Sequence, residues 1–389
     1  MNNSGNKDFN LTITTLFGLE EVLATEVRSI GGRNVKIRNR AVQCVGDLGF
    51  VYKCNLLLRT AIKVLLPINL IKFRDDLSYY KAIKKINWPE IFDIHKSFAI
   101  HVSGQSIMFR NSLYAAQKAK DAIVDHFRET YEGKRPNVDP KFAQISISIH
   151  LNNHEAEIYL NSSGDSLHRR GYKSKPGFAP ISEVLAAGIL KFTNWNGGKL
   201  FFDPMCGSGT FLIEAAMLAS NIPAGIFRKD FSFTHWKDYD SDLFEKIRES
   251  SLKRSLEYEG RIMGRDLEPE ALDAARENIT NALFDDLITV KKADFLTDDA
   301  PAKQGIMVMN PPYNVKIKSE NNNKFYEQIG NKLKHSYAGW DVYIITGDLE
   351  AAKHIGLKPS WRKKLFNGKL ESYLLKFELF EGKRKDLFK

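Results

Sequence analysis

Several features that characterise other classes of protein are scarce in this 389-residue sequence. It has three cysteines (Cys44, Cys54 and Cys206) and no CxxC pair, which argues against a disulfide framework and against a cysteine-based zinc site. No run of about 20 apolar residues occurs, and the start, MNNSGNKDFN, has no apolar core. The sequence therefore predicts neither a membrane span nor a secretory signal. We expect a metal-free protein of the reducing cytoplasm.

The composition is that of an ordinary globular protein with excess positive charge. Hydrophobic residues make up 43% and charged residues 27%, and the net charge is +10. The charge is spread along the chain but forms local basic clusters, at 36–40, 168–173 and 383–385. An excess of this kind favours a polyanionic partner. The length suggests two or three domains.

Three parts of the chain differ in their patterns. Residues 1–65 predict a small α+β unit, with a helical pattern over 19–30 and a strand at 41–45. Residues 66–163 place strands at 98–102 and 145–151 around a helix, 112–129, that an Asn111/Ser112 cap begins. In residues 164–389, buried-type strands alternate with helices, which is typical of a doubly wound parallel α/β sheet. These strands are expected at 199–202, 260–264, 287–290 and 305–309.

A glycine-containing motif follows the first of these strands: Asp203-Pro204-Met205-Cys206-Gly207-Ser208-Gly209-Thr210. Glycines let the backbone turn tightly and approach a ligand. The motif is not the dinucleotide GxGxxG pattern, because Asp-Pro precedes the glycines and no third glycine opens the helix. That helix start can stabilise a carboxylate, such as the one on a methionine moiety. We interpret Cys206 as a small loop residue, not a nucleophile.

Two carboxylates follow the next two strands. Asp266 ends the second strand, where an acidic residue can accept both ribose hydroxyls of a nucleotide. Asp294 ends the third and could accept the adenine amino hydrogens, with Phe295 near the ring. A single acid after a strand is most often a helix cap or a turn residue. The recurrence at successive strand ends instead favours S-adenosylmethionine as the cofactor.

The fourth strand is followed by Asn310-Pro311-Pro312-Tyr313, about a hundred residues after the glycine motif. An exocyclic ring amine is a poor nucleophile because its lone pair is delocalised. The Asn310 side-chain oxygen and the Pro311 carbonyl can accept its two N–H groups, the paired prolines rigidify that carbonyl, and Tyr313 can stack on the base. Catalysis would then come from positioning and preorganised acceptors. This tetrapeptide predicts methylation of an amine on a planar ring.

Residues 166–389 resemble the catalytic domain of THUMP-domain class I methyltransferases that modify guanine N2 in RNA, most closely the N-terminal half of fused large-subunit ribosomal RNA enzymes. Upstream, segments at 111–114, 120–125 and 133–136 look like a THUMP domain. The segments that carry the catalytic resemblance are 166–172, 203–216, 233–236, 310–313 and 364–368. The resemblance implies a ferredoxin-like domain (1–65), a THUMP RNA-binding domain (66–163) and a Rossmann-like methyltransferase domain (164–389).

The same resemblance implies roles for individual residues. The cofactor would be lined by residues of the glycine motif, with Asp266 on the ribose, Asp294 and Phe295 at the adenine, and the tetrapeptide on the target base. The predicted cofactor set is Asp203, Pro204, Cys206, Gly207, Gly209, Thr210, Asp266, Asp294 and Phe295. The predicted catalytic set is Asn310, Pro311, Pro312 and Tyr313, and RNA contacts are expected at Arg169, Arg170 and Lys173.

Two departures from the family and three alternatives remain. The family continues from the tetrapeptide with Gly-Glu-Arg, whereas Asn314-Val315-Lys316 stands here, and no second methyltransferase domain is expected because the chain ends at 389. A transfer RNA guanine-N2 methyltransferase would have the same domains. A DNA amino methyltransferase shares the tetrapeptide, but the THUMP-like region opposes it. A non-catalytic RNA-binding assembly factor would not need intact cofactor and amine motifs.

Overall fold

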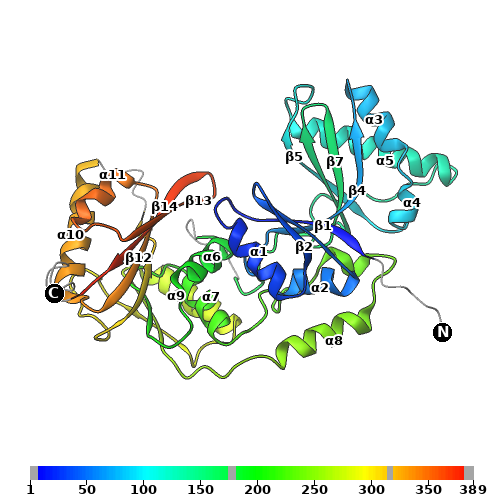
Figure 1. The fold of residues 1–389 in the computed structure, drawn as a ribbon. Coiled ribbons are helices and arrows are strands. Elements are labelled where there is room, and N and C mark those ends of the chain that lie inside the picture. The colour runs from blue at the N-terminus through cyan, green and yellow to red at the C-terminus, as the bar shows by residue number, and fades with distance from the viewer. Residues whose placement is uncertain (1–7, 174–180, 313–318, 381–389) are drawn as a thin grey trace. The chain divides into compact units, whose positions relative to one another are not determined.

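The computed structural model describes residues 8–173, 181–312 and 319–380 (Figure 1). Contacts within the chain divide it into two compact units. The first comprises Met1–Thr15, Leu23–Leu167 and Arg228–Glu249, and the second comprises Leu16–Val22, His168–Phe227 and Ser250–Lys389. Among the described residues, no helix has the length and apolar character needed to cross a membrane. Within the same ranges, no three His, Cys, Asp or Glu side chains are grouped to hold a metal ion.

The first half of the N-terminal sheet has the ferredoxin-like βαββαβ arrangement. Its elements are β1 (Phe9–Thr14), α1 (Glu20–Ser29), β2 (Arg33–Arg38), β3 (Ala41–Gly46), α2 (Leu48–Leu57) and β4 (Lys63–Lys72). The strand order is β2-β3-β1-β4, with antiparallel pairing throughout. Asp47 begins α2 by accepting the Phe50 N–H at 2.7 Å. The predicted α+β ferredoxin-like unit is confirmed.

Residues 66–163, the predicted THUMP part, extend the same sheet. Their elements are α3 (Asp76–Lys84), α4 (Trp88–Ile91), β5 (Phe98–Gln105), α5 (Ser112–Thr130), β6 (Ile145–Asn152) and β7 (Glu155–Asn161). Strand β4 is long enough to pair with β1 at its start and with β7 afterwards, so seven strands form one sheet, β2-β3-β1-β4-β7-β6-β5. Asn111 caps α5 through the Leu113 N–H at 2.8 Å, as predicted from the sequence.

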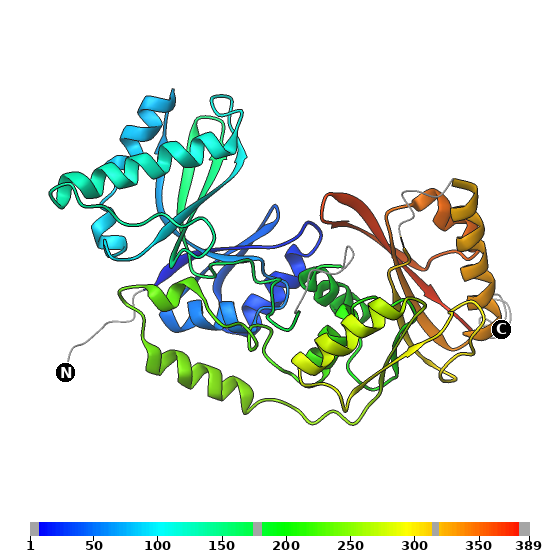
Figure 2. The ribbon, with the colours of Figure 1, turned by 180° about the vertical axis from the view of Figure 1, so that it is seen from behind.

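The second unit contains a mixed sheet in the order β10-β9-β8-β11-β12-β14-β13. Its elements are α6 (Glu183–Thr193), β8 (Phe201–Asp203), α7 (Thr210–Ala219), β9 (Ile262–Asp266), α9 (Pro269–Asn281), β10 (Ile288–Lys292), β11 (Gly305–Met309), α10 (Ser319–Ser336), β12 (Trp340–Thr346), α11 (Leu349–Ala352), η2 (Lys353–Ile355), β13 (Trp361–Asn367) and β14 (Leu370–Glu378). Figure 2 shows helices on both faces, α6, α7 and α9 on one and α10 and α11 on the other.

This sheet confirms the predicted Rossmann-like class I methyltransferase fold and adds one feature to it. The five strands β8 to β12 are parallel, as the buried strand patterns predict. Strand β14 is antiparallel to β12 and lies between β12 and the edge strand β13. The strand order reverses between β8 and β11, and in such sheets ligands bind outside the carboxyl ends at this position.

One segment of the predicted third domain belongs to the first unit. Residues 228–249 contain η1 (Ser232–His235) and most of α8 (Ser241–Leu252). The Phe233 ring lies 4.6 Å from that of Tyr52, the Phe233 N–H donates to the Ser162 carbonyl at 3.0 Å, and the Asp240 N–H donates to the Tyr52 hydroxyl at 2.9 Å. Residues 228–249, within the predicted methyltransferase domain (164–389), therefore pack with the first unit, because these aromatic side chains are buried there.

Candidate functional site

Four predicted site residues lie at the carboxyl edge of the second sheet. Asp203 ends β8 and is in register with Gly264 of β9. On its other side β8 pairs with β11, and Asn310 follows the last residue of β11. The Ala293 N–H donates to the Asp266 carbonyl at 3.1 Å, which brings the ends of β9 and β10 together. Asp203, Asp266, Asp294 and Asn310 are thus gathered at one edge, beside the reversal in strand order.

The glycine loop between β8 and α7 is open at one position. Gly207 has φ of +53°, and no heavy atom lies within 4 Å of where its Cβ would be. Gly209, with φ of +80°, precedes α7, and a Cβ there would lie 3.4 Å from the Ala275 Cβ. Gly209 therefore allows close packing on α9, whereas Gly207 leaves space on the ligand side of the loop.

Two carboxylates hold this loop. The Asp266 Oδ2 accepts the Gly207 N–H at 2.7 Å, and its Oδ1 accepts the Glu268 N–H at 3.0 Å, so each oxygen retains a lone pair for a hydroxyl. Asp203 is buried, and its Oδ1 accepts the Met205 N–H at 3.1 Å. Burial raises the pKa of Asp203 well above its ordinary value, and the nearby Asp266 raises it further. A cationic ligand group would offset both effects.

Three further members of the glycine motif, Pro204, Cys206 and Thr210, are buried. Burial raises the pKa of the Cys206 thiol well above its ordinary value, which opposes the thiolate form needed for nucleophilic attack. The Thr210 hydroxyl has no hydrogen-bond partner among the described residues, although it is buried at the start of α7. These three side chains shape the loop from within, and the hydroxyl is a polar group still to be satisfied.

The structure modifies the prediction for Asp294 and Phe295, which follow β10. Asp294 is half-buried, and its Oδ1 accepts the Leu296 N–H at 2.9 Å. The Phe295 side chain is 2% exposed and packs in the core, with its ring 5.6 Å from that of Tyr337. Only the backbone of Phe295 can therefore lie near the adenine ring, since its side chain completes the core. Its backbone stays at the sheet edge.

Asn310 carries an unsatisfied acceptor. Its Oδ1 is buried and has no hydrogen-bond partner within the part of the chain that the structure describes. Pro311 is buried and Pro312 is exposed. Tyr313, and with it Asn314-Val315-Lys316, lies outside the described residues. A buried acceptor without a donor costs about 1–3 kcal/mol, so a donor from a bound ligand would be stabilising at this atom.

The basic cluster at 168–173 differs most from its prediction. Arg170 is 2% exposed, and its Nε lies 3.2 Å from Oε1 of Glu214 on α7. The prediction that Arg170 contacts RNA is therefore wrong, because its guanidinium is enclosed in an ion pair within the protein. Lys173 lies 3.0 Å from Glu183 and is largely buried, whereas Arg169 is exposed.

The structure adds three side chains that the sequence analysis did not single out. Glu214 is a lone acid in the apolar run of α7, a pattern that could have indicated a buried partner. Asn278 on α9 donates to the Ser208 carbonyl at 3.0 Å and so fixes the glycine loop. Arg265 donates to the Asp299 carbonyl at 2.7 Å and lies over the Phe202 ring, which holds the loop after Asp294.

A cavity of about 700 Å³ lies away from this edge, beside the end of α6 and the first residue of β13. Two acids and two lysines line it, and Lys376 lies 2.6 Å from Glu378 and 3.8 Å from Asp341. The formal charges of these four side chains sum to zero, and no lining side chain is among the described buried groups that lack a hydrogen-bond partner. We place the candidate site at the carboxyl edge.

Known protein families match consecutive parts of the chain. Residues 10–65 match the RlmL ferredoxin-like domain, residues 75–161 the THUMP domain, and residues 170–376 the RMKL-like methyltransferase domain. The chain is 34% identical over 369 residues to slr0064 of Synechocystis sp., a candidate RNA methyltransferase, covering 94% of this chain and 96% of that protein.

Crystal structures of related chains agree with the fold over nearly the full length. The candidate methyltransferase SMU.472, solved with S-adenosylhomocysteine, is 26% identical, with a TM-score of 0.86 over 97% of this chain and 100% of that one. A candidate methylase from Clostridium difficile 630 is 28% identical, with a TM-score of 0.84 over the same shares. A relative that holds the demethylated cofactor indicates S-adenosylmethionine as the cofactor here.

Proposed function

We propose that this chain, which belongs to the RlmL-like family of S-adenosylmethionine-dependent RNA methyltransferases, methylates the N2 amine of a guanosine in large-subunit ribosomal RNA. The observation that carries the proposal is the orphaned Asn310 Oδ1 at the carboxyl edge of the sheet, close to the open glycine loop. The match to the RlmL ferredoxin-like domain supports the choice of ribosomal RNA.

Different residues at the carboxyl edge of the sheet suit the cofactor and the target amine. Gly207 leaves room for the cofactor, Asp266 offers lone pairs to ribose hydroxyls, and the buried Asp203 suits the ammonium of the methionine moiety. S-adenosylmethionine supplies an electrophilic methyl group when bound. Asn310 Oδ1 accepts one N–H of the target amine, and the Pro311 carbonyl accepts the other. Holding the amine in line is then the protein's main contribution to the rate.

The target base must be accessible to this edge. In a duplex the guanine N2 already donates one N–H to its paired cytosine, so it cannot give both N–H groups to Asn310 and Pro311. The substrate guanosine is therefore unpaired or flipped out. The THUMP domain supports RNA as the polyanionic partner of this basic chain.

Asp203→Asn is expected to stabilise the ligand-free protein at pH 7–8 and to weaken S-adenosylmethionine binding by about tenfold or more. Because burial raises the pKa of Asp203 above its unfolded value, the folded protein binds this proton more tightly. The free energy of unfolding then falls as the pH rises from the unfolded pKa of about 4 toward the folded pKa. The asparagine side chain does not titrate, so the variant does not lose this stability. Melting temperatures from pH 4 to 8 and isothermal titration calorimetry measure both effects.

The matched control for this experiment is Asp273→Asn. The Asp273 side chain is 75% exposed on α9, so the substitution should change neither the pH dependence nor cofactor affinity. A melting temperature for Asp203→Asn below that of the wild type at pH 8 would show that the buried carboxylate stabilises the ligand-free fold, contrary to this prediction.

Mapping of modified guanosines tests the proposed function directly. Ribosomal and transfer RNA from cells with and without the protein would be digested and analysed for N2-methylguanosine by mass spectrometry. We expect one position in large-subunit ribosomal RNA to lose its methyl group when the protein is absent. Loss only in transfer RNA would refute the ribosomal substrate, and unchanged N2-methylguanosine in both fractions would refute the guanine-N2 assignment.

A further inference from the structure

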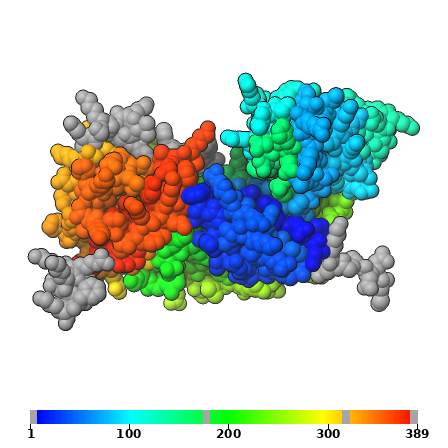
Figure 3. Space-filling view, turned by 45° about the horizontal axis from the view of Figure 1, so that its top comes forward, coloured from blue at the N-terminus to red at the C-terminus, as the bar shows by residue number. Residues whose placement is uncertain are grey.

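The segment Lys364-Leu365-Phe366-Asn367-Gly368 takes no part in the chemistry described above, yet it forms most of the exposed edge strand β13. Arg362, Lys364 and Phe366 alternate along this strand and therefore share one face. Leu365, on the other face, is fully buried. Figure 3 shows the β13–β14 region, in orange to red, at the molecular surface.

Aromatic rings lie beside these cations. The Phe17 ring, 37% exposed, contacts the Phe366 ring edge to face, with centroids 5.5 Å apart. The Lys364 Nζ lies 5.7 Å from the Phe366 centroid. Tyr373 of β14 is opposite Lys364 in register and so faces the same side. We define the β13 surface as Phe17, Arg362, Lys364, Phe366 and Tyr373.

The charge on this part of the chain is strongly positive. Six lysines or arginines and one acid, Glu371, occur from Lys358 to Lys376. Glu371 lies 2.7 Å from Lys364 and accepts the Tyr373 hydroxyl at 2.8 Å, so it orients the ring. The Lys364–Glu371 pair is more than 40% exposed on both sides, so a phosphate can replace the carboxylate as the partner of this ammonium. No ion-pair partner of Arg362 occurs within residues 8–173, 181–312 and 319–380. Lysine and arginine side chains on an edge strand prevent unwanted pairing with another strand. Exposed aromatic rings do not, so protection of the edge does not explain the rings beside these cations.

The strand register connects this surface to the candidate site. Met309, the residue before Asn310, is in register with Ile344 of β12, Ile344 with Leu375 of β14, and Leu375 with Arg362. Three strand spacings of about 4.8 Å separate the two ends of this row, roughly 14 Å in all. Each nucleotide of a stacked strand advances about 3.4 Å, and an extended single strand advances further, so a few nucleotides span that distance.

We infer that the β13 surface binds the single-stranded RNA that flanks the target guanosine, with Arg362 and Lys364 on phosphates and the Phe366–Phe17 pair as a stacking platform. Grooves that bind single strands combine these two elements, cations along the backbone and rings for successive bases. This inference rests on the proposed function, because it assigns a binding surface to the RNA whose base is methylated.

The experiment compares two substitutions that remove different interactions. The probe is a fluorescein-labelled, 15-nucleotide single-stranded RNA of mixed sequence, and anisotropy measures its Kd at several salt concentrations. Arg362→Ala with Lys364→Ala should lower the slope of log K against log salt by about 1.4, which is two phosphate contacts at about 0.7 each. Phe366→Ala should weaken binding by about fivefold to a hundredfold without changing that slope.

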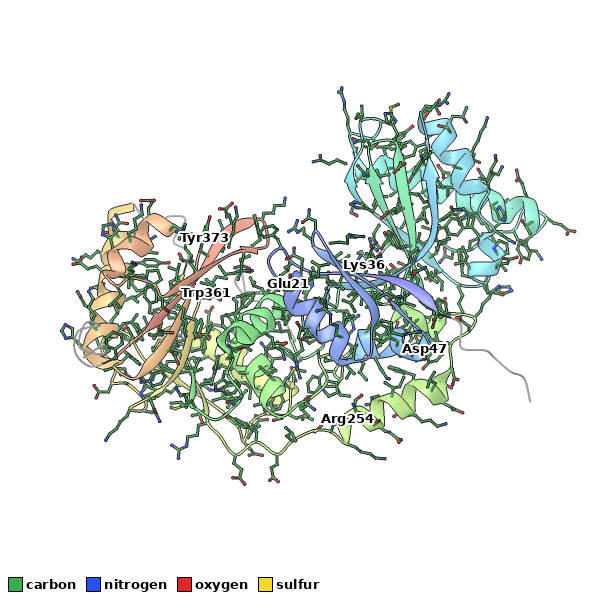
Figure 4. The ribbon with its side chains drawn as sticks, viewed as in Figure 1. Glu21, Lys36, Asp47, Arg254, Trp361 and Tyr373 are labelled. Atoms are coloured by element: carbon green, nitrogen blue, oxygen red, sulfur yellow. The ribbon has the colours of Figure 1, made fainter. Side chains whose placement is uncertain are left out.

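Matched controls separate this surface from general effects of charge and folding. Lys253→Ala with Arg254→Ala removes the same charge from an exposed turn of the same unit, and Figure 4 shows Arg254 far from Tyr373. This control and the wild type should have equal salt slopes. Phe17→Ala tests the platform again if Phe366→Ala lowers the melting temperature, and S-adenosylmethionine affinity should be unchanged in every variant.

The outcomes distinguish the two proposals. If the wild type methylates ribosomal RNA but the β13 variants bind the probe no more weakly than the control, the β13 surface is not the RNA-binding surface. If the wild type methylates no RNA, the proposed function fails, and this inference fails with it. Weaker RNA binding together with a higher KM for RNA and an unchanged KM for S-adenosylmethionine supports the inference.

Discussion

Asn310→Ala is expected to slow methyl transfer by about 10²–10³-fold while S-adenosylmethionine binds with unchanged affinity. The Asn310 Oδ1 is a buried acceptor without a donor in the described parts of the chain, so its partner is expected to come from the substrate. Removing it leaves one N–H of the target amine unsatisfied as charge develops on the nitrogen. Transfer of tritium from labelled S-adenosylmethionine to RNA measures the rate, and calorimetry measures cofactor affinity.

Two further substitutions separate hydrogen bonding from shape at this position. Asn310→Leu has nearly the native size but no acceptor, so it should lose as much activity as Asn310→Ala. Asn310→Asp retains an acceptor oxygen and should keep measurable transfer. Equal activity in the leucine variant and the wild type would show that Oδ1 does not act on the amine. Loss of cofactor binding in all three variants would instead assign Asn310 to the cofactor.

The parts of the fold that local patterns determine were predictable from the sequence. Helix α5 was expected at 112–129 and spans Ser112–Thr130, because its Asn111 cap and its apolar spacing act within a few residues. The parallel strands were predictable because burial on both faces demands continuous apolar runs. The polar residues that end those strands then had to share one edge, which brought Asp203, Asp266 and Asn310 together.

The features that depend on distant partners were not predictable. Arg170 was expected at the surface because an isolated charge is costly to bury, and its partner Glu214, the lone acid of an otherwise apolar helix, is 44 residues away in the sequence. Phe295 was placed on adenine because its sequence position follows Asp294, whereas its rotamer completes a core shared with Tyr337. The insertion of β14 between β12 and β13 likewise depends on pairing that no local pattern encodes.

Glu214→Gln is expected to lower the free energy of unfolding by about 3–5 kcal/mol, a large fraction of the stability of most domains. The Arg170 and Glu214 side chains are 1% and 0% exposed. The Arg170 Nε lies 3.2 Å from Oε1 of Glu214, and its Nη2 lies 3.4 Å from Oε2. Burial lowers the pKa of Arg170, but Glu214, with smaller contributions from Tyr172 and Glu183, offsets this and holds the pKa above its ordinary value. The glutamine would leave a buried cation without that carboxylate. Urea unfolding measures the loss.

The double variant Arg170→Met with Glu214→Leu tests the cause of that loss. Replacing both charges with apolar groups of similar volume removes the buried cation, so stability should recover to within about 2 kcal/mol of the wild type. Arg276→Ala is the surface control: its pair with Asp273 is 2.9 Å long but more than half exposed, and the substitution should lower the free energy of unfolding by less than about 1 kcal/mol.

If Glu214→Gln costs no more than Arg276→Ala, the buried pair does not hold the segment before residue 174 against α7. If the single and double variants are equally unstable, lost packing, and not the unpaired charge, causes the effect.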